Sequence, residues 1–107
     1  MKRGEIWTVS GPGYAGKPRP AVILQDDRFA ATASVTLCVF TTDPTEAPLI
    51  RLEVQPTPEN GLRQASKLMA DKLTTVSRER LGERVGELAP ADMVRLERAV
   101  MVFLGVV

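Results

Sequence analysis

The distribution of apolar and polar residues along the chain predicts a protein built mainly from β-strands. Short runs rich in Val, Ile, Leu and Thr are separated by clusters of Pro, Gly, Asn and Asp, which favour turns. Several of these runs alternate between apolar and polar residues, as strands with one buried face do. The pattern predicts six strands, at residues 5–9, 19–25, 35–42, 49–54, 66–76 and 83–88. The β-branched run at 35–42 is the clearest of them.

Three local features are expected between or within these strands. The Asn60-Gly61 pair predicts a turn inside a proline-containing loop over residues 55–64. The strand at 66–76 is expected to be irregular around Ala70 and Asp71. Ser77 is expected to cap a short helical turn that follows this strand.

The end of the chain carries the only helix that the sequence predicts clearly. Pro90 suits the first helical position, and Asp92 lies where the helix dipole favours a negative charge. Apolar residues then recur at helical spacing, at Met93, Leu96, Val100, Phe103 and Leu104. Gly105 is expected to end the helix. The apolar stripe is wide enough to pack on a sheet or on a partner, and we expect it to pack in the core.

Composition limits the chemistry that the chain can perform. The 107 residues suit one domain, 1–107, and contain no histidine. Histidine is the commonest acid/base group and the commonest metal ligand, so its absence argues against zinc catalysis and imidazole-based nuclease mechanisms. We expect neither a metal ion nor a cofactor. Cys38 is the single cysteine, which excludes an internal disulfide, and its apolar neighbours predict a buried thiol rather than a nucleophile.

Two further features of composition concern where the protein acts. No apolar run has the length of a membrane span, and Met1-Lys2-Arg3 does not lead into the apolar segment of a signal peptide, so we expect a cytoplasmic protein without membrane contact. The formal net charge is only +1, so any affinity for nucleic acid must come from local clusters of charge. The two candidate clusters are Lys2, Arg3, Lys17 and Arg19, and Arg63, Lys67 and Lys72.

Arg19 is the most distinctive candidate for chemistry. Pro18 and Pro20 on either side restrict the backbone at this point, where a polar segment enters an apolar strand. A guanidinium on a stiff backbone suits phosphate, because its planar donors can make two parallel hydrogen bonds. An ordinary surface arginine at a strand end is the alternative. Tyr14, in the glycine-rich loop before it, is either a base-stacking residue or part of a plain hairpin connection.

Five segments, in their order and spacing, resemble the MazF/PemK family of toxin endoribonucleases. They are Arg3-Gly4-Glu5-Ile6-Trp7, Arg19-Pro20-Ala21-Val22-Ile23-Leu24, Val39-Phe40-Thr41-Thr42, Leu68-Met69-Ala70-Asp71 and the terminal amphipathic helix. The resemblance implies a mainly β fold with a helix: a small SH3-like barrel of bent antiparallel strands followed by the C-terminal helix. It also implies a homodimer that cuts single-stranded RNA at short motifs and is inhibited by an antitoxin with an acidic, partly disordered tail.

The resemblance places the family's essential arginine on Arg19 and its essential threonine on Thr41, with Thr42 as the neighbouring alternative. It implies a metal-independent cut in which the ribose 2′-hydroxyl attacks phosphorus and leaves a 2′,3′-cyclic phosphate and a 5′-hydroxyl. Arg19 and Thr41 would stabilise the phosphorane. Other candidate substrate contacts are Tyr14, Lys17, Thr42, Arg63, Lys67, Asp71 and Lys72. Met69, the last helix and the strand ends are candidate dimer contacts.

The chain departs from the family pattern in the segments that read bases. Its first loop is short, Lys72 stands where many members have glutamine, and Thr74 replaces a usual basic residue. These differences leave the cleavage motif open. Two other functions also remain. Gyrase-binding CcdB toxins share the fold, but they anchor on a tryptophan near the C-terminus, whereas the matching stretch here, Leu104-Gly105-Val106, has the glycine but no tryptophan. An inactive SH3-like binding module is the third possibility.

Overall fold

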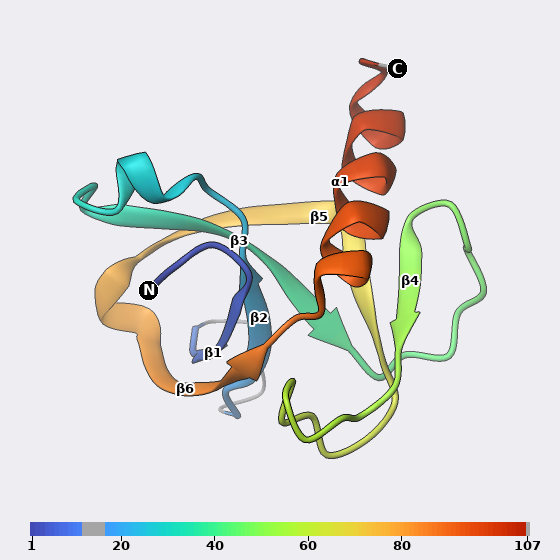
Figure 1. The fold of residues 1–107 in the computed structure, drawn as a ribbon, viewed down its shortest axis with the longest axis horizontal. Helices are drawn as coiled ribbons and strands as arrows, with labels where there is room; N and C mark the ends of the chain where they lie inside the picture. Colours follow the sequence, from blue (N-terminus) through green and yellow to red (C-terminus); the bar gives the residue numbers. More distant parts are fainter. Residues whose placement is uncertain (12–16, 107) are drawn as a thin grey trace.

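A computed structural model of the protein describes residues 1–11 and 17–106. Its six antiparallel strands form one sheet in the order β4-β5-β3-β2-β1-β6 (Figure 1). The strands are β1 (Glu5–Val9), β2 (Arg19–Ile23), β3 (Ser34–Thr41), β4 (Arg51–Val54), β5 (Ser66–Ser77) and β6 (Leu81–Glu87). The helix α1 (Pro90–Leu104) follows. The predicted mainly β fold of bent strands with a C-terminal helix is confirmed.

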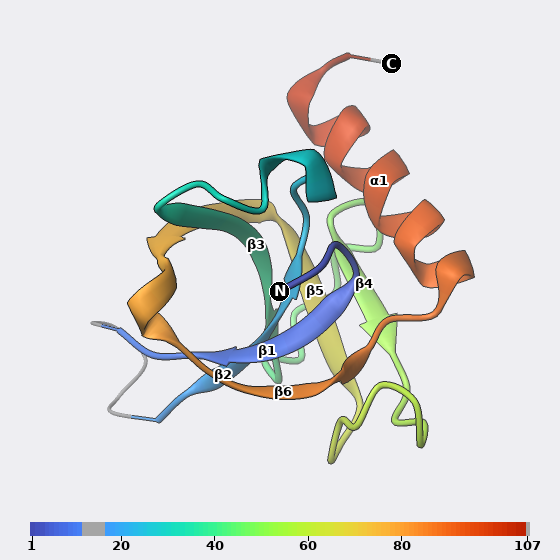
Figure 2. The same cartoon turned by 60° about the vertical axis from the view of Figure 1, so that its left-hand side comes forward.

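The sheet curls strongly (Figure 2). Its edge strand β6 follows β5 in the sequence, although three strands lie between them in the sheet. β3 and β5 lose register between Cys38 and Phe40, because Cys38 pairs with Leu73 whereas Phe40 pairs with Leu68. The extra residues in β5 form a bulge, which increases the local bend and twist of a strand. The irregularity predicted at Ala70 and Asp71 is therefore confirmed, and it lies where the sheet turns.

Two apolar clusters lie on opposite faces of the curled sheet. The inner cluster contains Ala21 and Ile23 of β2 with Leu37 and Val39 of β3, and the outer cluster contains Val22 with further residues of β5 and α1. This division follows the period-two alternation of β2. The same alternation puts Arg19 on the face of Ala21 and Ile23, at the end of the inner cluster.

The ends of several strands differ from those predicted. β2 stops at Ile23, because the Gln25 side chain rather than its backbone accepts the hydrogen bond from the Thr36 N–H, at 3.0 Å. β4 starts at Arg51, because a turn closed on the Ala47 carbonyl occupies the residues before it. β6 begins earlier than predicted, since the capped turn Arg78–Arg80 leads straight into it. The turn at Asp27–Phe29, capped by Asp26, was not predicted.

The helix α1 has the predicted limits, with Pro90 in its first turn and Gly105 beyond its end at φ +73°. A left-handed residue at this position is favourable for glycine. Leu96 and Ala99 are buried, but Phe103 and Leu104 are 49% and 58% exposed. The prediction that the whole stripe packs in the core is wrong, because the last turns extend beyond the sheet (Figure 1). Within the described residues, no helix is long and apolar enough to span a bilayer.

Candidate functional site

A cleft of about 780 Å³ opens beside the adjoining ends of β2 and β3. Its described lining comes from five parts of the fold: β1, the start of β2 with the residues before it, the end of β3, the segment at 61–66 and the segment at 83–85. These residues are Thr8, Lys17, Pro18, Arg19, Pro20, Phe40, Thr41, Thr42, Gly61, Leu62, Arg63, Gln64, Ser66, Glu83, Arg84 and Val85. The cleft therefore draws on segments from most of the chain.

The register of the sheet brings Arg19 and Thr41 together in this cleft. Ala21 of β2 pairs with Val39 of β3, and Arg19 and Thr41 lie two residues further along the two strands in the same direction. Residues two apart in a strand share a face, so both side chains project on the same side. Arg19 is partly buried and Thr41 is only 8% exposed. The predicted pair is thus placed side by side at the wall of one cleft.

The Thr41 hydroxyl is oriented by its own loop. Its Oγ1 accepts a hydrogen bond from the Asp43 backbone N–H at 3.1 Å. A hydroxyl has one hydrogen and two lone pairs, so this contact occupies an acceptor position and leaves the hydrogen for another partner. Thr42 is exposed and lines the same cleft. Of the two threonines, Thr41 has the more constrained hydroxyl.

Asn60 fixes the turn that leads into the cleft-lining segment at 61–66. Its side chain is 3% exposed; Oδ1 accepts from the N–H groups of Thr57 and Leu62, and Nδ2 donates to the Gln55 carbonyl. Gly61 follows at φ +68°, and a Cβ there would lie 2.2 Å from the Val85 carbonyl oxygen. Only glycine fits such a close approach in this conformation. The predicted Asn60-Gly61 turn is confirmed, and it holds Leu62 and Arg63 at the cleft.

The described lining of the cleft is basic. It contains Lys17, Arg19, Arg63 and Arg84 against the single carboxylate of Glu83, a net charge of +3. Lys17 and Arg63 are exposed. This arrangement favours a polyanion, and low-dielectric walls strengthen the local field. Of the residues proposed from the sequence, the structure therefore brings together Lys17, Arg19, Thr41, Thr42 and Arg63.

Five residues with polar side chains in the described cleft lining were not proposed from the sequence, namely Thr8, Gln64, Ser66, Glu83 and Arg84. Thr8 could have been found from strand pairing, because it lies opposite Pro20 in the β1–β2 hairpin. Glu83 joins it through a 2.9 Å hydrogen bond from its N–H to Thr8 Oγ1. Arg84 and Gln64 had no sequence signal that set them apart from ordinary surface residues.

Lys67 and Asp71, both proposed as substrate contacts, have partners within the protein. The Asp71 carboxylate accepts two hydrogen bonds from Arg51, at 2.8 and 3.1 Å, and this contact lowers the pKa of Asp71. Lys72 is exposed; neither it nor Asp71 is among the described residues that line the cleft. Tyr14 lies outside the described residues.

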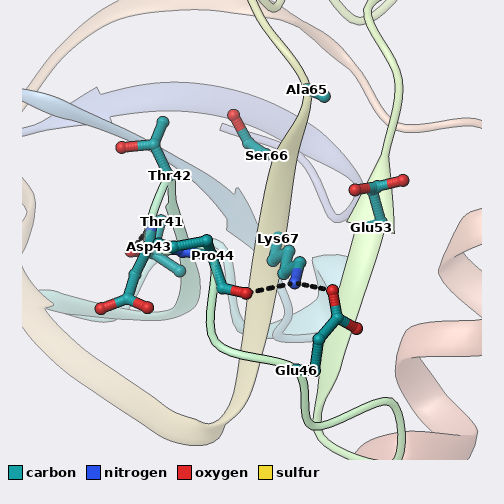
Figure 3. Close-up of a pocket in the computed structure, with 9 residues that line it drawn as sticks. All are labelled: Thr41, Thr42, Asp43, Pro44, Glu46, Glu53, Ala65, Ser66 and Lys67. Carbon is teal, nitrogen blue, oxygen red and sulfur yellow. Dashed lines mark hydrogen bonds and ion pairs between the residues drawn. The ribbon is translucent and has the colours of Figure 1, made fainter.

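Lys67 lies instead in a smaller pocket of about 220 Å³, which shares Thr41, Thr42 and Ser66 with the cleft. Figure 3 shows the Lys67 ammonium pointing towards Pro44 and Glu46, on the segment that follows Thr41. It donates to the Pro44 carbonyl at 3.3 Å, the Thr45 carbonyl at 2.9 Å and Glu46 Oε1 at 3.2 Å. This pocket is therefore built around an internal cation beside the main cleft.

Cys38 is buried in the outer cluster, and burial raises the pKa of its thiol to about 12. A thiol in this state is a poor nucleophile, which agrees with the sequence-based interpretation. Within residues 1–11 and 17–106, no three side chains of Cys, Asp or Glu are grouped so that they could hold a metal ion. The chemical groups that the described lining of this site offers are guanidinium, ammonium, hydroxyl, amide and the single carboxylate of Glu83.

Glu5 forms a hydrogen-bonded ion pair with Arg84, one of the arginines that line the cleft. Burial alone would raise the pKa of this carboxyl, but hydrogen bonds from the Lys2 N–H, the Trp7 indole and Arg84 outweigh it and lower the pKa from 4.5 to about 2. The Trp7 and Arg84 contacts are 3.1 and 3.0 Å long, and the Glu5 side chain is 16% exposed. Glu5 thus links β1 to Arg84 at the edge of the cleft.

Replacing Glu5 by glutamine is expected to make stability less dependent on acid pH. A carboxyl whose pKa is lowered on folding stabilises the fold fully above its unfolded pKa, and this stabilisation is lost as the pH falls through the folded pKa. The window therefore runs from 4.5 down to about 2. At about 1.4 kcal/mol per pKa unit, the effect is at most about 3 kcal/mol. Urea unfolding of parent and Glu5→Gln proteins should show a difference at pH 6 that shrinks towards pH 2; a constant difference would contradict this account.

Comparisons with known proteins agree with the site. Residues 2–104 match the family described as PemK-like, MazF-like toxin of type II toxin-antitoxin system. The chain is 58% identical over 107 residues to a probable endoribonuclease MazF from Mycolicibacterium smegmatis, covering 99% of this chain and 98% of the relative. A solved mycobacterial endoribonuclease in complex with its cognate antitoxin is 26% identical, with a TM-score of 0.80 over 100% of this chain and 97% of that one.

A more distant structure supports the fold alone. The MazE-MazF structure from Deinococcus radiodurans is 19% identical, with a TM-score of 0.76 over 98% of this chain and 95% of that chain. The family match covers every residue of the strands and the helix and every residue of the described cleft lining. The chain therefore belongs to the PemK-like, MazF-like toxins of type II toxin-antitoxin systems.

Proposed function

We propose that this toxin is a metal-independent endoribonuclease that cuts single-stranded RNA at the Arg19–Thr41 pair. The observation that supports it most directly is the placement of both side chains on one face, at adjoining strand ends, in a cleft whose described lining is basic. Guanidinium and hydroxyl donors suit a phosphate on which negative charge grows during reaction. The similarity to a probable endoribonuclease over the full chain supports the same activity.

The proposed reaction is an internal transesterification. The 2′-hydroxyl oxygen attacks the adjacent phosphorus, forming a new P–O bond, and the P–O5′ bond breaks. The proton lost from the 2′-hydroxyl is balanced by the one gained by the leaving 5′-oxygen, so the cut consumes no water. The products are a 2′,3′-cyclic phosphate and a 5′-hydroxyl. Holding the attacking oxygen and phosphorus in line supplies a large part of the acceleration.

The two proposed catalytic residues have different roles. Arg19 donates to the non-bridging phosphoryl oxygens and stabilises the phosphorane, where preorganised donors are most effective. Thr41 donates its hydroxyl hydrogen to the same phosphate, since its oxygen already accepts from the Asp43 N–H. Neither group is a strong base at neutral pH. We therefore expect a slow enzyme that depends on orientation and electrostatics.

The remaining cleft residues would bind the RNA chain. Lys17, Arg63 and Arg84 would contact the flanking phosphates, and Thr42 and Gln64 would offer polar groups to bases; all five line the cleft. Phosphate contacts of this kind make binding weaken as salt rises. The proposed base stacking by Tyr14 and the contacts by Asp71 and Lys72 stay predictions of the sequence.

We also propose that the protein acts in the cytoplasm as a homodimer under the control of an antitoxin. An acidic, partly disordered antitoxin tail would bind the same basic cleft as the RNA and exclude it. The exposed Phe103 and Leu104, with Met101 and Val102 before them, leave an apolar surface at the end of α1 that a second copy could cover. These contacts would put the dimer interface on the last helix, one of the places proposed from the sequence.

Incubation with a long unstructured RNA in excess EDTA is expected to give discrete fragments, because no step of the proposed reaction needs a metal ion. The readout is the pattern of fragments on a denaturing gel, with protein freed of any antitoxin. RNA that stays intact while the protein is folded would overturn the proposal and favour the alternative hypothesis, a toxin that binds a protein target.

A further inference from the structure

Lys67 differs from the other cations near the cleft because it is almost fully buried. It is 9% exposed and lies directly opposite Thr41 in the ladder between β5 and β3. Buried lysines occur in proteins mainly where the ammonium has partners. The sequence suggested a contact with substrate phosphate for this residue, and its surroundings indicate another role.

The ammonium of Lys67 has a complete set of partners inside the protein. An ammonium has three hydrogens to donate, and three oxygens surround this one: two backbone carbonyls and a carboxylate. The carboxylate belongs to Glu46, which is 86% exposed, so that ion pair contributes little. The two carbonyls, on Pro44 and Thr45, are therefore the contacts that matter. A phosphate would have to displace them.

Hydrogen bonds connect these carbonyls to the Thr41 hydroxyl. The Thr45 N–H donates to the Asp43 carboxylate at 2.8 Å, and the Asp43 N–H donates to Thr41 Oγ1 at 3.1 Å. Bonds from the Thr45 hydroxyl and N–H lower the pKa of Asp43, so its carboxylate stays charged as an acceptor. Lys67 thus holds the segment at residues 43–46 in place, and the Asp43 N–H at the start of that segment orients the Thr41 hydroxyl.

We propose that Lys67 is a positioning residue for Thr41. Its side chain fixes the segment at residues 43–46, and through the Asp43 N–H it holds the Thr41 hydroxyl towards the cleft. The role rests on the proposed endoribonuclease function, because it assigns Thr41 to the reacting phosphate. Lys67 itself does not contact the RNA.

Lys67→Met tests this role, because it removes the donors and keeps most of the side-chain length. A displacement of about 1 Å in a reacting group can cost on the order of 100-fold in rate. We expect the single-turnover rate at saturating RNA to fall by about 10- to 100-fold. Binding of an uncleavable RNA, with a 2′-deoxyribose at the cut, should keep its affinity and its dependence on salt.

A phosphate contact would give the opposite pattern. Losing one contact lowers the slope of log affinity against log salt by about one and weakens binding, while the saturated rate is preserved. That result would overturn the proposal. Arg28→Met, which removes an exposed positive charge outside the cleft lining and outside both basic clusters, is the charge-matched control and should match the parent in rate and salt slope.

Lys67→Gln keeps the test decisive if the methionine variant does not fold. Glutamine is uncharged like methionine but retains N–H donors, one atom closer to the backbone. Under the positioning role it should recover part of the lost rate, because one carbonyl still has a donor. If it behaves as a protein that has lost one phosphate contact, with a lower salt slope and the parental saturated rate, the proposal fails.

Hydrogen exchange separates failure of this inference from failure of the proposed function. In Lys67→Met or Lys67→Gln, the amides of Asp43 and Thr45 should exchange faster than in the parent, whereas those of β2 should not change. This comparison decides whether Lys67 orders the segment even if the parent cuts no RNA. Unchanged exchange at Asp43 would overturn the proposal.

Discussion

Replacing Arg19 by alanine is expected to lower the single-turnover rate of RNA cleavage by about 1,000-fold. Removing one preorganised donor from a site of developing negative charge typically costs about 100- to 1,000-fold, and a guanidinium supplies two donors and a full charge. Arg19 lies at the mouth of the inner apolar cluster, where low dielectric strengthens its field. The measurement is the rate at saturating RNA, with circular dichroism to confirm the fold.

Two further variants separate geometry from charge at this position. Arg19→Lys keeps the charge but loses the planar fork, so its rate should fall between those of the parent and Arg19→Ala. Arg98→Ala removes an exposed arginine from α1, outside the described lining of the cleft, and should cut RNA at the parental rate. If Arg19→Ala also cuts at the parental rate, Arg19 is not the residue that stabilises the phosphorane.

Replacing Thr41 by valine is expected to lower the cleavage rate by about 100-fold while RNA binding changes little. Valine is close to threonine in size and shape but has no hydroxyl, so the variant removes the donor to the phosphate at a site that is only 8% exposed. It also leaves the Asp43 N–H without its acceptor, which costs about 1 to 3 kcal/mol of stability where that group is shielded from water. Rate and thermal unfolding are therefore measured together.

The serine variant controls for this loss. Thr41→Ser keeps a hydroxyl that can accept from Asp43 and donate to phosphate, so it should retain most of the activity. Thr42→Val tests the neighbouring alternative, and it should lose less than Thr41→Val because the Thr42 side chain is exposed. A larger loss at Thr42 than at Thr41 would exchange the two assignments.

Much of the fold could be predicted because local pattern and tertiary structure agree. β-Branched runs became strands, Pro90 and Gly105 set the limits of α1, and the alternation along β2 predicted which residues share a face. Strand ends were less predictable, because side chains compete with the backbone there. The Gln25 side chain accepts a hydrogen bond from the Thr36 N–H that a backbone carbonyl would accept in a continued strand, and no residue pattern predicts this replacement.

The site was predicted in part, for a physical reason. That Arg19 faces a threonine depends on the pairing register of two strands, which a residue pattern does not contain; the family resemblance suggested the pair before the register was known. The resemblance could not tell which lysines reach solvent. Lys67 and Lys72 look alike in sequence, but one is bound to the Pro44 and Thr45 carbonyls and the other is exposed.

The exposed end of α1 illustrates the same limit. Helical spacing shows that Phe103 and Leu104 belong to an apolar stripe, but it does not show where the sheet beneath the helix ends. Leu96 and Ala99 are buried because β4 and β5 lie below them. Whether a residue further along the stripe is core or interface depends on the size of the sheet, which is a property of the whole fold.

The central claim is that the RNA supplies its own nucleophile, and one measurement tests it most directly. An RNA with a mapped cut is compared with the same RNA carrying a single 2′-deoxyribose at that nucleotide, both in EDTA, and the ends of the fragments are analysed. The account predicts cyclic phosphate and 5′-hydroxyl ends from the all-ribose RNA and no cut at the substituted nucleotide. Cleavage of the deoxy-substituted RNA at that position, or 5′-phosphate ends, would contradict it.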